Sequence, residues 1–240
     1  MTQYRWVRTE PLRIFIGFDS KEPVAYHVLA HSILRRATVP VMIAPLVQSA
    51  LRASGLYTRE RGATESTEFS LTRFLVPALC GFRGHAVFMD CDMLCRVDVD
   101  HLWDEIMAHS AAVLVCQHDY TPREGVKFLG HQQTVYPRKN WSSFMVFDNS
   151  RCAALTPAYV NGASGLELHR FAWTDDHQIG ALPLDWNWLV GDYEPNDAAK
   201  IYHYTLGGPW FDATNDCDHA DLWFEESALM LHAEQREVPA

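Results

Sequence analysis

The stretch that decides the fold is Ala86-Val87-Phe88-Met89-Asp90-Cys91-Asp92, in which four apolar residues run into two aspartates one residue apart. A short, uninterrupted apolar run is typical of a central strand that is covered on both faces. In open α/β sheets, ligands bind just beyond the carboxyl ends of the strands. The stretch therefore predicts a buried strand that ends at the edge of a sheet and presents a metal-binding pair of carboxylates there.

The Asp-x-Asp spacing is weak evidence by itself. With 17 Asp among 240 residues, chance alone gives about one such pair. The three pairs in the chain are Asp90/Asp92, Asp98/Asp100 and Asp216/Asp218. Because only the first pair directly follows an unbroken apolar run, we expect the other two on solvated surface.

The composition bounds the class of protein. A hydrophobic content of 48% with 8 Trp in 240 residues suffices for a packed core, and a formal net charge of −10 argues against nucleic acid or an anionic membrane as a partner. The 6 Cys show no Cys-x2-Cys spacing, which favours a reduced, cytoplasmic protein. No apolar h-region opens the sequence, and no apolar stretch approaches the ~20 residues of a transmembrane helix.

The chain opens as strand, helix, strand, which is typical of a doubly wound α/β sheet. Residues 12–18 predict a strand, residues 23–36 a helix capped by Asp19 and Ser20, and residues 39–44 a second strand. The polar residues 52–68 and the irregular segment 118–139 predict loops. Further predicted elements are a helix from Ser70 through Leu79, strands at 85–89, 94–97, 111–116, 143–147 and 201–204, and a helix at 100–109.

We find no internal repeat and no linker, so the sequence predicts one domain over residues 1–240. Its core covers about 12–211, and an amphipathic helix follows at about 220–234. Two roles stay open for this helix: it docks on the core, or it pairs with another subunit to make a homodimer.

Three motifs accompany the aspartate pair, in a fixed order along the chain. They are Arg73-Phe74-Leu75-Val76-Pro77, Asn140-Trp141-Ser142-Ser143, and His203 followed by Gly207-Gly208-Pro209-Trp210. Together with Asp90/Asp92, they resemble the retaining glycosyltransferases of family eight, the group that includes glycogenin and bacterial lipopolysaccharide galactosyl- and glucosyltransferases. The resemblance implies an α/β protein with the GT-A fold, which is a single Rossmann-like mixed sheet flanked by helices.

The resemblance also implies the reaction. A sugar moves from a nucleoside diphosphate donor, expected to be a UDP-sugar, to a hydroxyl of a glycan, lipid or protein, with retention. Negative charge develops on the leaving diphosphate, and a divalent ion stabilises that charge. Asp90 and Asp92 offer hard oxygen ligands for Mg²⁺ or Mn²⁺, and the imidazole of His203 as third ligand favours Mn²⁺.

The residues that would contact the donor also follow from the resemblance. Phe18, Asp19 and Tyr26 line the base and ribose pocket, and Asp90 contacts the ribose as well as the metal. Cys91 belongs to this segment, although its side chain is expected to pack in the core. The residues expected to face the donor sugar are Arg73, Asp90, Asn140, Ser142 and Ser143. For Arg73 a second role stays open, on the surface of an amphipathic helix.

A later stretch, residues 175–178, resembles the family's acidic-Gln segment near the anomeric carbon. This resemblance predicts that Asp175, Asp176 and Gln178, together with Arg73, are catalytic residues. The stretch carries an extra residue, His177, so its alignment shifts by one or two positions. Asp175 and Asp176 are equally suited to capping a helix.

One position departs from the family pattern. The family carries a Lys directly before Pro-Trp, where it holds the donor phosphates, and this chain has Gly208 there. Backbone N–H groups of Gly207 and Gly208 could form a phosphate-binding nest instead. Otherwise a basic side chain from elsewhere in the sequence would have to contact the donor phosphates, and the candidates are Lys127, Arg138 and Lys200.

Two other functions stay open at this point. A nucleotidyltransferase acting on sugar phosphates shares the sheet and the metal chemistry, but it usually has a Gly-rich loop after the first strand, where this chain reads Phe18-Asp19-Ser20-Lys21-Glu22-Pro23. A catalytically inactive nucleotide-sugar binding protein would explain the missing Lys.

Overall fold

The computed structural model describes residues 10–62, 65–119, 126–127, 131–132 and 138–232, and for 126–127 and 131–132 it describes the backbone only. Most of the predicted loop 118–139, including Lys127 as a side chain, therefore lies outside the described residues. Within the described part, no helix is long and apolar enough to cross a membrane.

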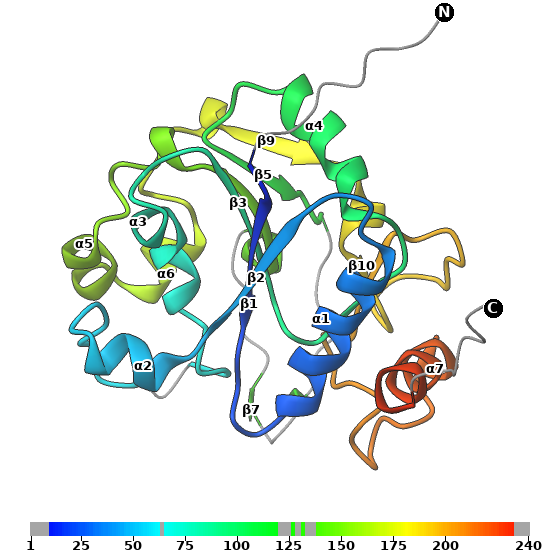
Figure 1. Ribbon diagram of the computed structural model, residues 1–240. Coiled ribbons are helices and arrows are strands. Elements are labelled where there is room, and N and C mark those ends of the chain that lie inside the picture. Colours follow the sequence, from blue (N-terminus) through cyan, green and yellow to red (C-terminus); the bar gives the residue numbers. More distant parts are fainter. Residues whose placement is uncertain (1–9, 63–64, 120–125, 128–130, 133–137, 233–240) are drawn as a thin grey trace, which may run out of the picture.

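A six-stranded mixed sheet forms the centre of the molecule, with the strand order β2-β1-β3-β8-β5-β9 (Figure 1). The strands are β1 (Leu12–Gly17), β2 (Val41–Leu46), β3 (His85–Met89), β5 (Val113–Cys116), β8 (Phe144–Asp148) and β9 (Ile179–Leu182). β8 runs antiparallel to β3 and β5, and the other pairings are parallel. The predicted Rossmann-like mixed sheet is confirmed, with the 86–89 stretch buried in its central strand.

A second, three-stranded sheet stands beyond the carboxyl end of β3. Its order is β10 (Trp188–Leu189), β11 (Ile201–His203) and β4 (Met93–Cys95). β4 follows Asp92 directly and pairs antiparallel with β11. A separate short ladder joins β6 (Val126–Lys127) to β7 (His131–Gln132).

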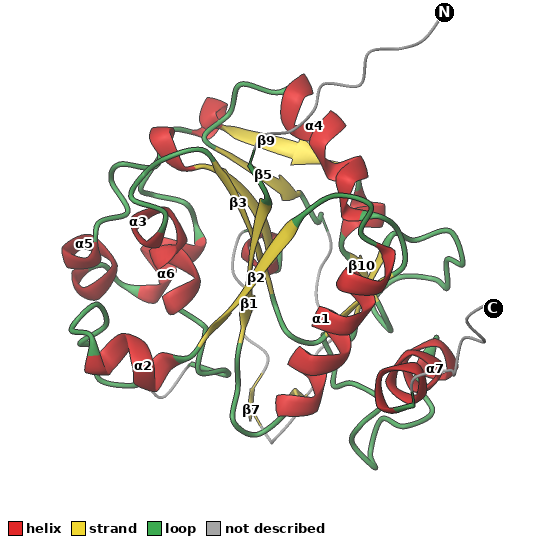
Figure 2. Cartoon of the chain, viewed as in Figure 1, coloured by secondary structure: helices red, strands yellow, loops and turns green. Residues whose placement is uncertain are grey.

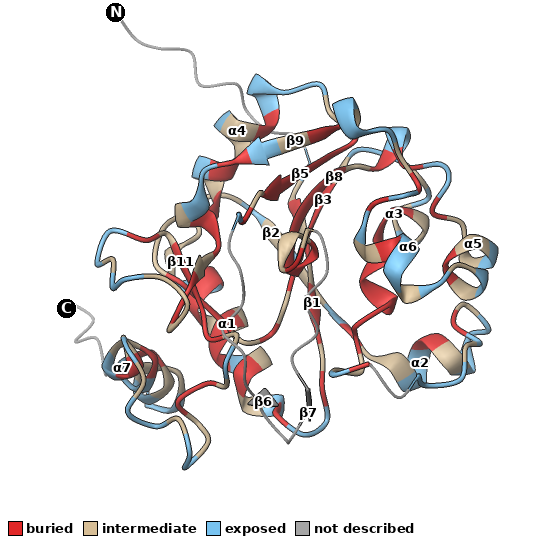
Figure 3. Ribbon diagram, turned by 180° about the vertical axis from the view of Figure 1, so that it is seen from behind, coloured by how far each residue is buried: buried red, intermediate tan, exposed pale blue. Residues whose placement is uncertain are grey.

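Helices cover both faces of the central sheet (Figure 2). α1 (Pro23–Arg36), α4 (Leu102–Ala108) and α7 (Ala220–Leu231) lie on one side, and α2 (Gln48–Ala53), α3 (Val76–Leu79), α5 (Pro157–Gly162) and α6 (Gly165–His169) lie on the other. Short 3₁₀ turns η1 (Thr72–Leu75), η2 (Val99–His101), η4 (Trp141–Ser143), η5 (Asn149–Arg151), η6 (Asp176–Gln178) and η7 (Leu184–Trp186) connect them. Figure 3 shows the buried residues concentrated in the strands between the two helical layers.

Several predicted elements differ in detail. α1 has the predicted bounds, but its N-cap is Glu22 without a side-chain cap, so the predicted cap by Asp19 and Ser20 is wrong. The helix predicted from Ser70 divides into η1 and α3, with Pro77 in the first turn of α3. The second strand starts two residues later than predicted, and Pro45 is tolerated because β2 is an edge strand.

Two elements near the core are among those that the sequence does not predict. α2 begins four residues before the predicted loop 52–68 and ends inside it, and β9 completes the sheet next to β5. β9 contains Gly180, which weakens a strand pattern. A Cβ at Gly180 would lie 2.5 Å from the Leu114 side chain and 3.2 Å from the Cβ of Ala111, so glycine avoids crowding where β9 pairs with β5.

The C-terminal helix α7 docks on α1 through one buried carboxylate. Glu226 is 1% exposed and pairs with His31 at 2.7 Å, Arg35 at 3.2 Å and Arg36 at 2.8 Å. Burial alone would raise the pKa of Glu226, but the hydrogen bond and charge of Arg36 and the charge of Arg35 outweigh it and lower the pKa. The ionised carboxylate therefore stabilises the packing of α7 on α1.

This packing predicts a pH-dependent stability difference. Because the folded-state pKa of Glu226 is lowered, its contribution is present above the unfolded value of 4.5 and is lost as pH falls through the folded value. Glu226→Gln should lower the free energy of unfolding by about 2 kcal/mol at neutral pH, and the difference should shrink in acid. Denaturant unfolding at several pH values measures this, with exposed Glu225→Gln as control. An equal effect of both variants would contradict the assignment.

Candidate metal centre and its surroundings

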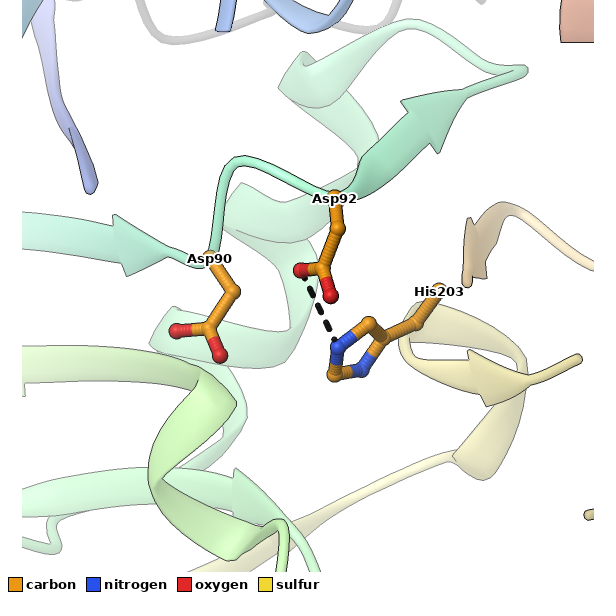
Figure 4. Close-up of side chains that lie close together, drawn as sticks. All are labelled: Asp90, Asp92 and His203. Carbon is orange, nitrogen blue, oxygen red and sulfur yellow. Dashed lines mark ion pairs between the residues drawn. The ribbon is translucent and has the colours of Figure 1, made fainter. Parts of the chain in front are cut away.

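Three side chains that can bind a metal converge beyond the carboxyl end of β3. Ligand atoms of Asp90, Asp92 and His203 all lie within 4.8 Å of one another, and His203 Nε2 is 3.2 Å from Asp92 Oδ1. Figure 4 shows the Asp92 carboxylate directed at the His203 imidazole, with Asp90 beside them at the other end of the same turn. Two carboxylates and one imidazole form a donor set that suits Mn²⁺ and also Mg²⁺.

Strand pairing brings His203 to the aspartates. The antiparallel register of β4 and β11 sets His203 opposite Met93, the residue after Asp92. The ladder continues past the strand, because Tyr204 N donates to Asp92 O at 2.9 Å. The position of the third ligand therefore depends on backbone pairing between segments more than a hundred residues apart.

Asn187 fixes the orientation of the His203 ring. Its Oδ1 lies 2.9 Å from His203 Nδ1, and its Nδ2 donates to Ser143 Oγ at 2.9 Å and to His118 Nε2 at 3.0 Å. Burial, followed by the charge of His203, lowers the pKa of His118 to about 3, so His118 is neutral and accepts this bond. Because Nδ1 of His203 is engaged by Asn187 Oδ1, Nε2 is the ring nitrogen that faces the carboxylates.

Arg73 lies on the other side of Asp90. Its Nη1 is 2.9 Å from Asp90 Oδ1 and donates to Ser142 O at 2.9 Å. The guanidinium carbon stands 5.4 Å and 4.9 Å from the ring centres of Phe69 and Phe88. Arg73 is 5% exposed, so its alternative placement on a helix surface is wrong.

Residues 140–143, which precede β8, lie next to Asp90 together with Arg73. Asp90 N donates to Ser143 O, and Asn140 adopts a left-handed conformation that starts the η4 turn. Ser142 Oγ bonds to Nδ1 of the half-buried His169 at 2.7 Å. Burial, and then the charge of Arg73, lowers the pKa of His169 to about 3, so the imidazole stays neutral. The structure thus brings the Arg73 and Asn140-to-Ser143 motifs together at Asp90, as the sequence predicts.

In the loop after β1, the residues predicted to line the base and ribose pocket make contacts that stabilise the loop itself. Phe18 packs edge-on against Tyr26, with ring centres 5.8 Å apart. Both carboxylate oxygens of Asp19 accept backbone N–H bonds, from Lys21 and from Glu68. Asp19 therefore organises the β1–α1 loop.

Glu22, which the sequence does not single out, lies beneath the metal cluster. Cys91, fully buried as predicted, donates from its thiol toward Glu22 Oε1 at 3.7 Å. Burial, followed by the charges of Asp92 and Asp19, raises the pKa of Glu22 to about 8. The hydrogen bond from Cys91 and the proximity of Trp210 partly offset this rise in the pKa of Glu22.

The predicted phosphate nest is wrong for Gly207. Its N–H donates to Tyr204 O at 2.9 Å and cannot also donate to a ligand. Gly208 lies against the Trp210 ring, where a Cβ would come within 2.0 Å of the ring carbons. Of the distant cations, Lys200 pairs with Asp185 at 3.2 Å and is thus engaged elsewhere.

The acidic-Gln stretch lies far from the cluster. Ala112 N, at the start of β5, donates to Gln178 O, and Asp148 N donates to Ala112 O, so Gln178 is level with the end of β8. Asp90 is level with Ser143, before the start of β8. The five residues from Ser143 to Asp148 span roughly 17 Å along the strands, and β9 lies three strands away from β3.

The two aspartates of this stretch have surface positions. Asp176 has an 82% exposed side chain and pairs with Arg138 at 2.6 Å. Asp175 is the N-cap residue of η6, without a side-chain cap. The structure therefore does not bring Asp175, Asp176 or Gln178 to the metal centre.

Comparison with known proteins agrees with this architecture. No family model matches the sequence. The chain is similar in structure to the WbbM bifunctional glycosyltransferase (16% identity, TM-score 0.65, covering 92% of this chain and 50% of that one). It is also similar to the glycosyltransferase GlyE of Streptococcus pneumoniae TIGR4 (12% identity, TM-score 0.61, covering 92% of this chain and 62% of that one). A third similar structure is the galactosyltransferase LgtC in complex with donor and acceptor sugar analogs (10% identity, TM-score 0.57, covering 93% of this chain and 98% of that one). The chain spans about half of WbbM. At these identities the likeness shows the fold, which is the GT-A fold of glycosyltransferases.

Sequence similarity is much higher to one plant protein. Protein CDI of Arabidopsis thaliana is 48% identical over 224 residues, which cover 90% of this chain and 86% of the relative. The chain thus belongs to the family of Protein CDI.

Proposed function

We propose that the protein is a divalent-metal-dependent glycosyltransferase related to retaining family eight, which moves a sugar from a UDP-sugar to an acceptor hydroxyl. The observation that carries the proposal is the cluster of Asp90, Asp92 and His203 at the carboxyl edge of a GT-A sheet. Ligands of open α/β folds bind at this edge. The acceptor hydroxyl belongs to a glycan, a lipid or a protein.

The residues present fit a divalent cation. Asp90, Asp92 and Nε2 of His203 would hold it, with Mn²⁺ favoured over Mg²⁺ because one ligand is an imidazole. When bound, the ion supplies Lewis-acid stabilisation of the negative charge on a leaving diphosphate. Asn187 serves the ion indirectly, since it keeps Nε2 directed at the cluster.

The chain's own residues position the donor. Arg73 holds Asp90 through an ion pair of 2.9 Å and keeps positive charge beside the site of sugar transfer. Asn140, Ser142 and Ser143 form the wall next to it. Phe18 and Tyr26 offer ring surfaces for the base at the end of β1, and the proposal gives the residues 175–178 no catalytic role.

In the proposed site, binding of the donor diphosphate depends more on the metal than it does in the family pattern. Gly208 stands where that pattern has a Lys, and Gly207 uses its N–H within its own turn. The metal centre is thus the main source of positive charge that the proposal assigns to the diphosphate. We therefore expect UDP binding to be strongly dependent on the divalent ion.

Asp92→Asn tests the metal centre directly. With one carboxylate ligand neutralised, UDP affinity in the presence of Mn²⁺ should fall by more than about 100-fold, as titration calorimetry would measure. Asp216→Asn is the matched control, because Asp216 belongs to another Asp-x-Asp pair and is exposed. Unchanged binding by Asp92→Asn would contradict the proposal.

Turnover is tested separately with a panel of UDP- and GDP-sugars and Mn²⁺. Release of UDP from a UDP-sugar, lost in Asp92→Asn, is the expected result. Tight UDP binding without release from any donor would instead identify a nucleotide-sugar binding protein.

Asn187→Leu tests the orientation of His203. Loss of the Oδ1 acceptor frees the imidazole to rotate, and Mn²⁺ affinity should fall about 10- to 100-fold in a protein that circular dichroism shows to be folded. Ser143→Ala, which removes a different bond to Asn187 and leaves the Asn187–His203 bond intact, should have a smaller effect. Equal Mn²⁺ affinity of Asn187→Leu and the wild type would exclude this role.

A further inference from the structure

The C-terminal helix α7 lies outside the central sheet, yet it contacts the segment that carries His203 and Gly208. Glu226 ties α7 to α1 through three cations. Trp223, one turn before Glu226, is 3% exposed and packs in a second hydrophobic cluster with Tyr202 and Tyr204 of the β11 segment. α7, which lies beside α1 in Figure 1, therefore packs against the segment that carries β11.

Trp223 supports Trp210 on the phosphate side of the site. The two indole ring centres are 5.1 Å apart. Trp210 in turn fills the space in front of Gly208, where no Cβ would fit, and Thr214 Oγ1 donates to Gly208 O at 2.7 Å. A shift of Trp210 would thus move the backbone at Gly208.

The start of α7 supports the other end of the same segment. Tyr204 Oη donates to His219 O at 2.9 Å, and the His219 ring stacks on Tyr202 at 4.2 Å. Tyr202 and Tyr204 flank His203 in sequence. The helix thus contacts both neighbours of the third metal ligand.

Trp210 also reaches the loop beneath the metal cluster. Trp210 is close enough to Glu22 to lower the pKa of that carboxyl. The same carboxyl accepts from the thiol of Cys91, which stands between the two aspartates in the sequence. Through Trp210, the position of Trp223 is coupled to Gly208 and to the Asp90–Asp92 turn.

We propose that Trp223 is a positioning residue of the donor site, which acts through Trp210 to hold the 203–210 segment against the Asp90–Asp92 turn. The inference rests on the proposed function, since it concerns the same nucleotide site. Trp223 acts on the site through the residues that it packs against, which are Trp210, Tyr202 and Tyr204. α7 accordingly contributes to the geometry of the donor site.

Trp223→Leu tests this role, with UDP and MnCl₂ as the probes in titration calorimetry. We expect UDP affinity to fall about tenfold, a loss of the size seen when groups that orient a ligand are removed. The donor KM should rise while kcat changes little, since binding of ground state and transition state is weakened alike. Trp223→Phe, which keeps an aromatic ring against Trp210, should restore most of the affinity. Phe224→Leu is the matched control, because Phe224 is the next residue and 45% exposed.

Glu226→Gln gives a second test that leaves every residue of the 203–210 segment unchanged. It loosens α7 at neutral pH and should also weaken UDP binding at a temperature where the protein is folded. Wild-type UDP affinity in folded Trp223→Leu and Glu226→Gln would overturn the inference and leave the proposed function standing. Equal losses in Phe224→Leu and Trp223→Leu would overturn it as well. Absence of Mn²⁺-dependent UDP binding in the wild type would overturn the proposed function, and the inference with it.

Discussion

The candidate site depends on one piece of backbone pairing, the antiparallel ladder between β4 and β11. β3 delivers Asp90 and Asp92 to the edge of the central sheet, but the third ligand comes from a segment that is remote in sequence. Pairing of Met93 with His203, extended by the Tyr204 N–H to Asp92 O bond, brings the imidazole to the carboxylates. Without this ladder, the two aspartates would remain an ordinary strand-end pair.

Electrostatics explains why this edge suits a cation. Asp19, Glu22, Asp90 and Asp92 belong to this edge, where burial and then repulsion by Asp92 and Asp19 raise the pKa of Glu22. Arg73 offsets part of this charge by pairing with Asp90. A divalent ion would add positive charge where carboxylates are concentrated and would attract a diphosphate that the acidic chain otherwise repels. A metal-bound diphosphate would therefore not need the Lys that Gly208 replaces in the family pattern.

Local patterns in the sequence predict much of the fold and part of the site. The apolar run before Asp90 and the Pro-initiated helix α1 can be read from neighbouring residues, and both occur as predicted. Asn187 cannot be read in this way, because its partners His203, Ser143 and His118 come from three separate segments; the only signal is a polar residue inside the aromatic run Trp186-Asn187-Trp188. For Gln178, the sequence predicts a place in the site that the structure does not give it. A short motif match does not reveal at which end of strand β9 a residue lies.

The central claim is that Asp90, Asp92 and His203 hold a divalent cation that binds a nucleoside diphosphate. The most direct measurement is a crystal structure of the protein with Mn²⁺ and UDP, with diffraction data collected at the manganese absorption edge. The account predicts an anomalous peak between the two carboxylates and His203 Nε2, with diphosphate oxygens bound to the same ion. A peak elsewhere, or UDP bound away from this cluster, would contradict it.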